Sequence, residues 1–431
     1  MKVLIATVGT RGDVQPFIAL GQGLRERGAE VVICTHARFR EFVLDHGLGY
    51  ADYNDDILQF LDSADGKMAV DGGGSFFGMV GVALRCTAKL KAMHRRGIQD
   101  LWHSVRASAP DLILFHPKAL GIVDIAEKLH IPCIFAFWMP MVVSTGEYPA
   151  LIFPKWPLGK FYHRLTYRLL DWGSWWGTRQ YINEWREANQ LSARRFRPQI
   201  QDGSGKRMPA VFGYSPAVIA RPNDWDDHTM VSGYWFLDDE RVEDAETELS
   251  AFIAAGEKPV YIGFGSIAGR EAKEKARIVV EAVKRAGVRA ILAVGWGGLD
   301  VAGLELPKTI KVVESVNHAW LFPRMAVVVH HGGCGTTAEG LRAGCPSVIC
   351  PFFADQPFWG RKVYELGVGP QPIPQKQLTA ANLAEAIRIA FSDSSMRRQA
   401  EALGKSIRQE DGVGVAVDFI SRETGLVGKK I

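Results

Sequence analysis

Polar residues between positions 331 and 356 have the types and spacing needed to bind a phosphorylated sugar. The apolar run 326–329 predicts a buried strand, and residues 336–342 predict a helix that ends at Gly344. The glycines between them therefore lie at a helix start, where unpaired backbone N–H groups and the helix dipole favour phosphate. His331 adds a side-chain donor at the same turn.

Downstream side chains supply hydrogen-bonding groups for hydroxyls. Glu339 lies one helical turn into the predicted helix, where its carboxylate is placed to hold two adjacent ribose hydroxyls. Asp355 and Gln356 follow the next apolar run, 347–350, and suit the hydroxyls of a sugar. Phosphate, ribose and sugar together predict a nucleotide sugar. The alternative is a generic strand–helix connection with His331 bonded to a backbone group, which explains the glycines but not the whole set.

This segment resembles the donor-binding box of family 1 glycosyltransferases, because His331, Thr336, Glu339, residues 344–346 and residues 355–356 fall at the spacing of that family. The resemblance implies an α/β protein of GT-B fold, with two Rossmann-like, doubly wound parallel-sheet domains facing across a cleft. It also implies UDP-glucose as the donor substrate, with no metal and no other cofactor.

The resemblance further implies which residues contact the donor. The turn 332–336 with His331 and Ser266 would neutralise the diphosphate, and the backbone of Val316 would hold the uracil, since residues 315–318 lack the tryptophan platform of the plant enzymes. The full set of expected donor contacts is Thr10, Arg11, Gly12, Ser266, Val316, His331, Gly333, Gly335, Thr336, Glu339, Asp355 and Gln356.

Asp13 is the expected catalytic base. The sequence 9–13 stands between a predicted strand, 3–8, and a predicted helix, 14–27. In many family 1 enzymes a histidine at this position deprotonates the acceptor hydroxyl, whereas sterol and glycopeptide-antibiotic glycosyltransferases resemble this chain in having Asp. The alternative is that Asp13 is only the N-cap of the helix 14–27, which is a common role for an aspartate and is compatible with base catalysis. The second Asp that orients the histidine in plant members has no counterpart in residues 116–121.

The runs 9–15, 116–118, 125–129 and 351–359 narrow the resemblance to sterol glucosyltransferases. The implied reaction is an inverting transfer of glucose to the hydroxyl of a sterol or similar apolar fused-ring acceptor. One alternative is a natural-product glycosyltransferase acting on a macrolide, triterpenoid, flavonoid or glycopeptide aglycone. Another is a catalytically inactive nucleotide-sugar-binding module, although retention of Asp13 together with the donor box speaks against it.

Aromatic residues crowd the segment 137–185, with lysines and arginines among them. They would suit a pocket for a flat apolar ring system, a peripheral contact with a membrane surface, or the packing of two core helices. We expect acceptor contacts from this segment, with Phe137, Trp138, Met139, Trp172 and Trp176 as the candidate residues.

The chain of 431 residues is too long for a single hydrophobic core. Strands alternate with helices in both halves, which predicts two parallel sheets. We expect an N-terminal acceptor-binding domain at 1–225, a linker at 226–240, and a C-terminal nucleotide-sugar-binding domain at 241–405. A C-terminal helix or tail, 406–431, would return to the first domain.

Bulk composition favours an ordinary globular enzyme, with 47% hydrophobic and 23% charged residues. The net charge of +4 gives no case for nucleic acid as a partner. Six cysteines lie mostly in apolar runs without a CxxC pair, which indicates reduced thiols of a cytoplasmic protein, peripheral to a membrane if the aromatic segment contacts one. No apolar run reaches the length of a membrane span. Oligomeric state is left open.

Two other patterns are weaker. Residues 9–13 and 263–266 follow strands but lack the GxGxxG spacing of dinucleotide-binding proteins, so neither NAD nor flavin is expected. The DxD-like run 224–226 suggests a solvated turn in or near the linker, so no metal site is expected there.

Overall fold

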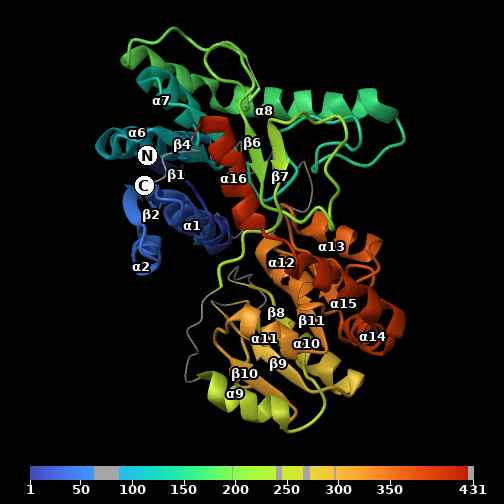
Figure 1. Ribbon diagram of the computed structural model, residues 1–431. Coiled ribbons are helices and arrows are strands. Elements are labelled where there is room, and N and C mark those ends of the chain that lie inside the picture. Colours follow the sequence, from blue (N-terminus) through green and yellow to red (C-terminus); the bar gives the residue numbers. More distant parts are fainter. Residues whose placement is uncertain (63–86, 197, 239–244, 266–271, 296–297, 426–431) are drawn as a thin grey trace. The chain divides into compact units, whose positions relative to one another are not determined.

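The computed structural model describes residues 1–62, 87–196, 198–238, 245–265, 272–295 and 298–425. The chain forms two compact units (Figure 1). The first unit contains Met1–Phe60, Ala83–Leu237 and Glu410–Ile431, and the second contains Asp238–Gln409.

A seven-stranded parallel sheet forms the centre of the first unit, in the order β3-β2-β1-β4-β5-β6-β7. Its middle strands are continuous apolar runs that are buried almost throughout, as expected of a parallel sheet covered by helices on both faces. The strands are β1 (Lys2–Ala6), β2 (Glu30–His36), β3 (Gly49–Tyr53), β4 (Leu112–Phe115), β5 (Cys133–Phe137), β6 (Ala210–Phe212) and β7 (Thr229–Val231).

The helices of this unit include one from the C-terminal end of the chain. That helix, α16, packs against α1, β6 and β7. Gly23 on α1 permits this approach, because a Cβ there would collide with Val413. The helices are α1 (Arg11–Glu26), α2 (Arg40–Asp45), α3 (Asp56–Asp62), α6 (Thr87–Ser108), α7 (Ile122–Leu129), α8 (Gly159–Ala188) and α16 (Gly412–Thr424), with a 3-10 turn at Ala37–Phe39.

The second unit has a five-stranded parallel sheet in the order β10-β9-β8-β11-β12. Its strands are β8 (Val260–Gly263), β9 (Ala290–Ala293), β10 (Ile310–Val313), β11 (Val327–His330) and β12 (Ser347–Ile349). Its helices are α9 (Ala245–Ala254), α10 (Ala272–Ala286), α11 (His318–Leu321), α12 (Cys334–Ala343), α13 (Gln356–Glu365), α14 (Ala380–Ser392) and α15 (Ser394–Arg408), with 3-10 turns at Phe322–Arg324 and Gln375–Gln377.

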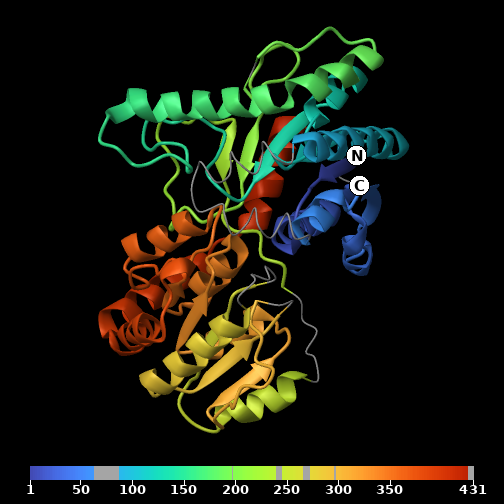
Figure 2. The same ribbon diagram turned by 180° about the vertical axis from the view of Figure 1, so that it is seen from behind.

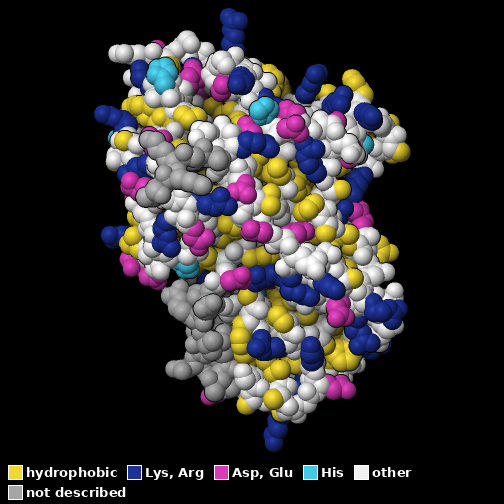
Figure 3. All heavy atoms as spheres, in the orientation of Figure 1, with side chains coloured by type: hydrophobic (Ala, Val, Ile, Leu, Met, Phe, Trp, Pro, Cys, Tyr) yellow, Lys and Arg dark blue, Asp and Glu magenta, His cyan; other side chains and the backbone are white. Residues whose placement is uncertain are grey.

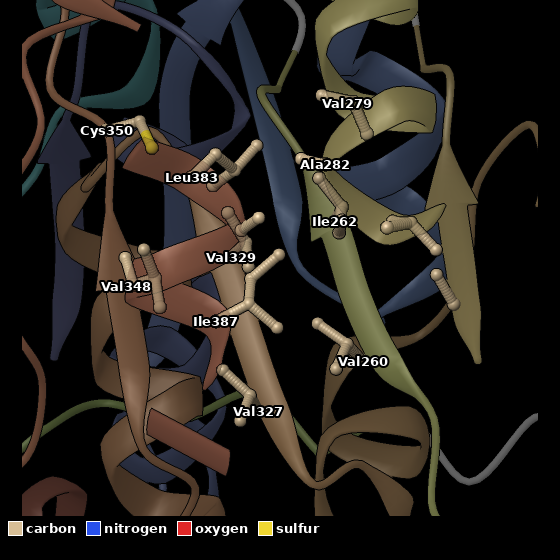
Figure 4. Close-up of a cluster of buried hydrophobic side chains, with 14 of the residues drawn as sticks. Val260, Ile262, Val279, Ala282, Val327, Val329, Val348, Cys350, Leu383 and Ile387 are labelled. Carbon is tan, nitrogen blue, oxygen red and sulfur yellow. The ribbon is translucent and has the colours of Figure 1, made fainter. Parts of the chain in front are cut away.

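Both faces of this second sheet are apolar. Val260 and Ile262 of β8 point to the face covered by α10 and α14, where they join Ile387 of α14 (Figure 4). Tyr261, between them in sequence, belongs to the cluster on the opposite face with Phe322. Because successive strand residues alternate between faces, a continuous apolar run is what a sheet buried on both sides requires.

Each sheet reverses its strand order beside its first strand. In the first unit β2 and β3 lie on one side of β1 and β4 lies on the other, and in the second unit β9 and β10 lie on one side of β8 and β11 on the other. In sheets of this kind, ligands usually bind at the carboxyl ends of the strands where the order reverses, here β1 and β4 and β8 and β11. The predicted doubly wound α/β fold is confirmed.

The structure differs from the sequence-based expectation at α8 and β7. The aromatic segment does not form two helices, because α8 is one uninterrupted helix of 30 residues. Strand β7 lies within residues 226–240, which were expected to be linker, and it continues the first sheet. Among the described residues, no helix has the combination of length and apolarity that a bilayer span needs.

A buried ion-pair cluster ties α8 to α7. Arg186, with 3% of its side chain exposed, donates to Asp124 at 2.7 Å and to Glu127 at 2.8 Å. Arg194 donates to the second oxygen of Asp124 at 3.0 Å. Removing the shared carboxylate would leave two guanidinium groups in a poorly solvated site, which typically costs several kcal/mol.

We expect Asp124→Ala to lower the free energy of unfolding by about 3 kcal/mol, measured by urea denaturation followed by circular dichroism. The matched control is Glu184→Ala, which breaks an exposed pair between α8 and Arg95 of α6 and should cost about 0.5 kcal/mol or less. Equal losses in the two variants would contradict the energetic importance of burial here.

Candidate functional site

The carboxylate of Asp13 lies at the carboxyl end of β1, in the first turn of α1. The helix begins at Arg11 with Thr10 as its N-cap, so the expectation that Asp13 is the N-cap of a helix 14–27 is wrong. Asp13 is instead the third helical residue, and its Oδ2 accepts the Thr10 backbone N–H at 2.6 Å and the Thr10 hydroxyl at 3.1 Å. This capping box fixes the carboxylate, whose side chain is only 8% exposed.

Two residues after β4 face the other oxygen of Asp13. Lys118 Nζ donates to Oδ1 at 2.8 Å, and His116 Nε2 lies 3.5 Å from the same oxygen. The backbone N–H of Lys118 donates to His116 Nδ1 at 3.1 Å. Because Nδ1 accepts this hydrogen bond, the neutral imidazole carries its proton on Nε2, which is buried and makes no hydrogen bond to the described residues.

These contacts fix the charge states. Burial alone would raise the pKa of Asp13, but Lys118, His116 and the Thr10 backbone N–H together outweigh it, so the pKa of this carboxyl is lowered. Burial, reinforced by Lys118, lowers the pKa of His116 to about 3. Near neutral pH the cluster therefore contains an ionised aspartate, a lysine ammonium and a neutral histidine.

Aromatic rings enclose His116. It stacks on Trp138 with ring centroids 4.8 Å apart and meets the edge of Phe137 at 5.0 Å. Phe137, Trp138 and Met139, three of the predicted acceptor residues, are all buried at the end of β5. Trp172 and Trp176 lie on α8 instead, and 57% and 60% of these residues are exposed. The five candidates therefore divide into a buried group beside the Asp13 cluster and an exposed pair on the long helix.

Thr10, Arg11 and Gly12, expected to touch the donor, surround the start of α1. Thr10 is engaged with Asp13 as described. Arg11 is exposed, donates to Gln15 at 3.2 Å, and lies 4.8 Å from the ring centre of Phe42.

In the second unit, His331 follows β11 and lies against the loop after β8. A Cβ at Gly265 would lie 2.9 Å from His331 Cε1, and Gly333 is similarly close to the other side of the ring. The imidazole therefore fits only between glycines. Its Nδ1 is buried without a hydrogen-bond partner in the described part of the chain, and burial lowers its pKa to about 4. A neutral, unsatisfied buried nitrogen suits a ligand that completes its hydrogen bond.

Helix α12 begins beside this histidine. Gly333 is its N-cap, and Gly335 and Thr336 lie in its first turn, where backbone N–H groups have no partner within the helix. Gly332 has a left-handed φ of 88°, and a Cβ there would lie 3.2 Å from the carbonyl oxygen of Gln356. Glycine thus brings the helix start against the loop after β12, which forms a concave turn suited to an anion.

Glu339 is bound to a neighbour in the ligand-free chain. Its Oε2 accepts from Arg342 at 3.0–3.1 Å, and Arg342 also donates to Asp238 at 2.7 Å. Burial raises the pKa of Glu339 to about 7, against the lowering effect of Arg342. The predicted ribose contact would therefore compete with, or share the carboxylate with, Arg342.

Asp355 and Gln356 open α13 and both support their own loop. Asp355 Oδ2 accepts from the indole of Trp359 at 3.1 Å, and Gln356 Oε1 accepts the backbone N–H of Phe352 at 2.7 Å. Val316 follows β10 and packs against the core on one face of the sheet. Ser266 lies outside the described residues.

The supporting role of Lys118 and His116 was missed in the sequence, although the run 116–118 was noted. The available signal was a lysine and a histidine directly after a buried strand. Pairing of β1 with β4, Ala6 opposite Phe115, brings that strand end level with Asp13. Nothing in the local sequence specifies this pairing. No group of three or more His, Cys, Asp or Glu side chains within the described ranges is arranged to hold a metal ion.

Two family models match the chain. The Glycosyltransferase family 28 N-terminal domain matches residues 3–145, and the Erythromycin biosynthesis protein CIII-like, C-terminal domain matches residues 297–411.

Relatives of known activity align along nearly the whole chain. Sterol 3-beta-glucosyltransferases UGT80A2 and UGT80B1 of Arabidopsis thaliana are each 37% identical, over 97% and 98% of this chain and 64% and 68% of their own length. A sterol 3-beta-glucosyltransferase of Saccharomyces cerevisiae is 36% identical over 98% of this chain and 35% of its own length. The chain thus spans about two thirds of the plant relatives and about a third of the yeast relative.

Solved structures share the fold. The glycosyltransferase of kitacinnamycin has a TM-score of 0.69 at 19% identity, covering 98% of both chains. The calicheamicin glycosyltransferase CalG4 has a TM-score of 0.69 at 17% identity, covering 99% of both chains. With two doubly wound sheets and similarity to the plant enzymes along nearly the whole of its own length, this chain belongs to the GT-B glycosyltransferase family that includes the sterol 3-beta-glucosyltransferases.

Proposed function

We propose that the protein transfers glucose from UDP-glucose to the hydroxyl of a sterol or a similar fused-ring alcohol, with inversion at the sugar carbon. The observation that carries this proposal is the 37% identity to a plant sterol 3-beta-glucosyltransferase over 98% of this chain and 68% of that enzyme. The buried carboxylate of Asp13 and the unsatisfied nitrogen of His331 support it, because each supplies a group that the reaction needs.

Asp13 acts as general base in this proposal. A carboxylate is a weak base for an alcohol, so the proton moves late, as the new glycosidic bond forms and the hydroxyl becomes acidic. Attack from the face opposite the departing UDP converts an α-linked donor into a β-glucoside. Thr10 and Lys118 hold the two carboxylate oxygens and keep the group ionised, so that its orientation is set before the acceptor arrives.

The donor is held by the second unit. His331 and the start of α12 donate hydrogen bonds to the diphosphate and stabilise the charge that develops as UDP leaves. Glu339 holds the ribose, Asp355 and Gln356 hold the glucose, and the backbone of Val316 meets the uracil. Ser266 adds a contact to the diphosphate, and Thr10, Arg11 and Gly12 are further proposed contacts to the donor. No metal enters this proposal, because backbone donors and a neutral imidazole take the place of a cation.

The acceptor class is tested by a screen at fixed UDP-glucose with EDTA present. We expect β-glucosides of sterols by mass spectrometry and NMR, at rates above those for triterpenoids, flavonoids and macrolides. Much faster turnover of a flavonoid or macrolide would replace the sterol assignment with a natural-product acceptor. Tight UDP binding without turnover of any alcohol would identify an inactive binding module.

Asp13→Asn should lower kcat by a factor of about 100 or more while leaving UDP affinity nearly unchanged, because it removes the base but keeps an acceptor for Thr10. Turnover is measured with saturating sterol and UDP affinity by calorimetry. His331→Ala serves as the comparison and should weaken both quantities. Loss of UDP binding in Asp13→Asn, with normal activity in His331→Ala, would reverse the two assignments.

Lys118→Met should move the acidic limb of the kcat/KM pH profile to higher pH. The Lys118 ammonium lowers the pKa of Asp13, and activity is lost as pH falls through that pKa, so removing the ammonium raises the pH at which loss begins. Lys118→Arg should restore most of the wild-type profile. Lys284→Met, an exposed lysine of the second unit, is the matched control.

A uniform loss of rate at every pH in Lys118→Met, without movement of the limb, would show that Lys118 contributes only to packing. The profile thus separates a positioning role from a structural one.

A further inference from the structure

Helix α8 turns an apolar stripe toward solvent. The residues of this stripe recur every three or four positions, which places them on one side of a helix. Phe161 is 80% exposed, which is extreme for an aromatic residue on a helix. The stripe consists of Leu158, Phe161, Leu165, Leu169, Trp172 and Trp176, all exposed.

The opposite side of α8 packs on its own unit. Thr166, Tyr167, Tyr181 and Trp185 are buried there. One side of the helix is therefore buried against its domain, as in any surface helix. The side that faces solvent, where charged residues are usual, carries apolar residues as well. Figures 1 and 2 both show α8 running along the margin of its unit.

The loop before α8 extends the stripe. Ile152 and Trp156 are more than half exposed. Trp156 stacks on Tyr162 of α8 with ring centroids 5.6 Å apart, and the Tyr162 hydroxyl donates to the Pro154 carbonyl at 2.8 Å. The loop is thus tied to the helix, and the two form one surface, which we call the α8 patch. At 1.5 Å per residue, its helical part is about 27 Å long.

Basic residues border the α8 patch. Lys160, Arg164, Arg168 and Arg179 lie on the same helix, and Arg164 is paired with Asp224 at 3.1 Å. Asp171, which is buried, is the only acidic residue in the sequence between positions 159 and 183. Arg179 lies 5.4 Å from the ring centre of Trp176. Figure 3 shows apolar side chains at the surface in the upper part of the view, mixed with basic and acidic ones.

We propose that the α8 patch docks on an anionic lipid bilayer, with the helix lying in the plane of the interface. Tryptophan and phenylalanine insert at the headgroup level, and arginine and lysine reach the phosphates while their stems follow the apolar boundary. The charge of the border selects this occupant. If a second copy of the chain bound here in a two-fold dimer, the two patches would face each other. The basic residues at their borders would then repel one another.

The exposure and charge of the α8 patch are independent of which acceptor the enzyme uses. If the proposed function holds, docking brings the enzyme to the phase in which a sterol is dissolved.

Docking is measured by co-sedimentation with vesicles of phosphatidylcholine containing one quarter phosphatidylserine, and with vesicles of phosphatidylcholine alone. We expect the wild-type chain to bind the anionic vesicles, more weakly as salt is raised. The variant Phe161→Gln/Leu165→Gln/Leu169→Gln should bind these vesicles at least about tenfold more weakly than the wild type, because three inserted side chains become polar. Circular dichroism confirms that each variant is folded.

Two matched controls use exposed residues of the second unit. Tyr364→Gln/Ile389→Gln removes exposed apolar side chains away from α8 and should leave binding unchanged. The charge of the border is tested with Arg168→Gln/Arg179→Gln, which should reduce the preference for anionic vesicles severalfold. Its control is Arg397→Gln/Arg398→Gln in the second unit, which should leave that preference unchanged.

Equal vesicle binding by wild type and the α8 triple variant would overturn the proposal, as would no binding by the wild type. A wild-type dimer that the triple variant converts to monomer, without vesicle binding, would identify a second copy as the occupant and also overturn it.

Activity assays separate this inference from the proposed function. The triple variant should glucosylate a sterol delivered on cyclodextrin at the wild-type rate, and lose rate only when the sterol is in vesicles. Vesicle binding by the wild type without glucosylation of any sterol would leave the docking surface standing and remove the proposed acceptor.

Discussion

The reversal of strand order in each parallel sheet is the constraint on which both candidate sites depend. Hydrogen bonding holds β1 beside β4 and β8 beside β11, so that the carboxyl ends of strands far apart in sequence are level. Asp13 and Lys118 are 105 residues apart and meet only because of this pairing. In the second unit the same reversal brings Gly265 against His331. Each site therefore forms only when its sheet has assembled.

The two sites handle buried polar groups in opposite ways. Asp13 is satisfied in advance by Thr10, with Lys118 compensating the burial of its charge, which fixes the carboxylate at the expense of basicity. His331 is left neutral with an unmade hydrogen bond, so a ligand that supplies an acceptor recovers the free energy that burial cost. In the proposed roles, a base that is positioned before the reaction and a histidine that gains a hydrogen bond on binding would contribute through positioning and through differential binding.

Local sequence patterns were enough to predict the fold and the glycine-rich start of a helix. Continuous apolar runs predicted the inner strands, and the glycines around His331 predicted a turn that admits close approach. The partners of Asp13 and Glu339 could not be predicted in this way. Lys118 depends on strand order, and the Glu339–Arg342 pair depends on burial that only the packed unit creates. Periodicity also indicates that α8 has apolar residues, but not which side the domain covers.

The aromatic segment 137–185 shows why composition alone leaves a role open. Its members have similar residue types, yet Trp138 stacks on the histidine beside Asp13 while Trp176 stands in solvent under an arginine. A buried ring shapes the space next to the reacting group, because its van der Waals contacts hold neighbouring side chains in place. An exposed ring bordered by cations instead has affinity for an interface between water and apolar material. Under the two proposals, the same types of amino acid therefore serve the reaction in one place and the docking on a bilayer in the other, and burial distinguishes the two environments.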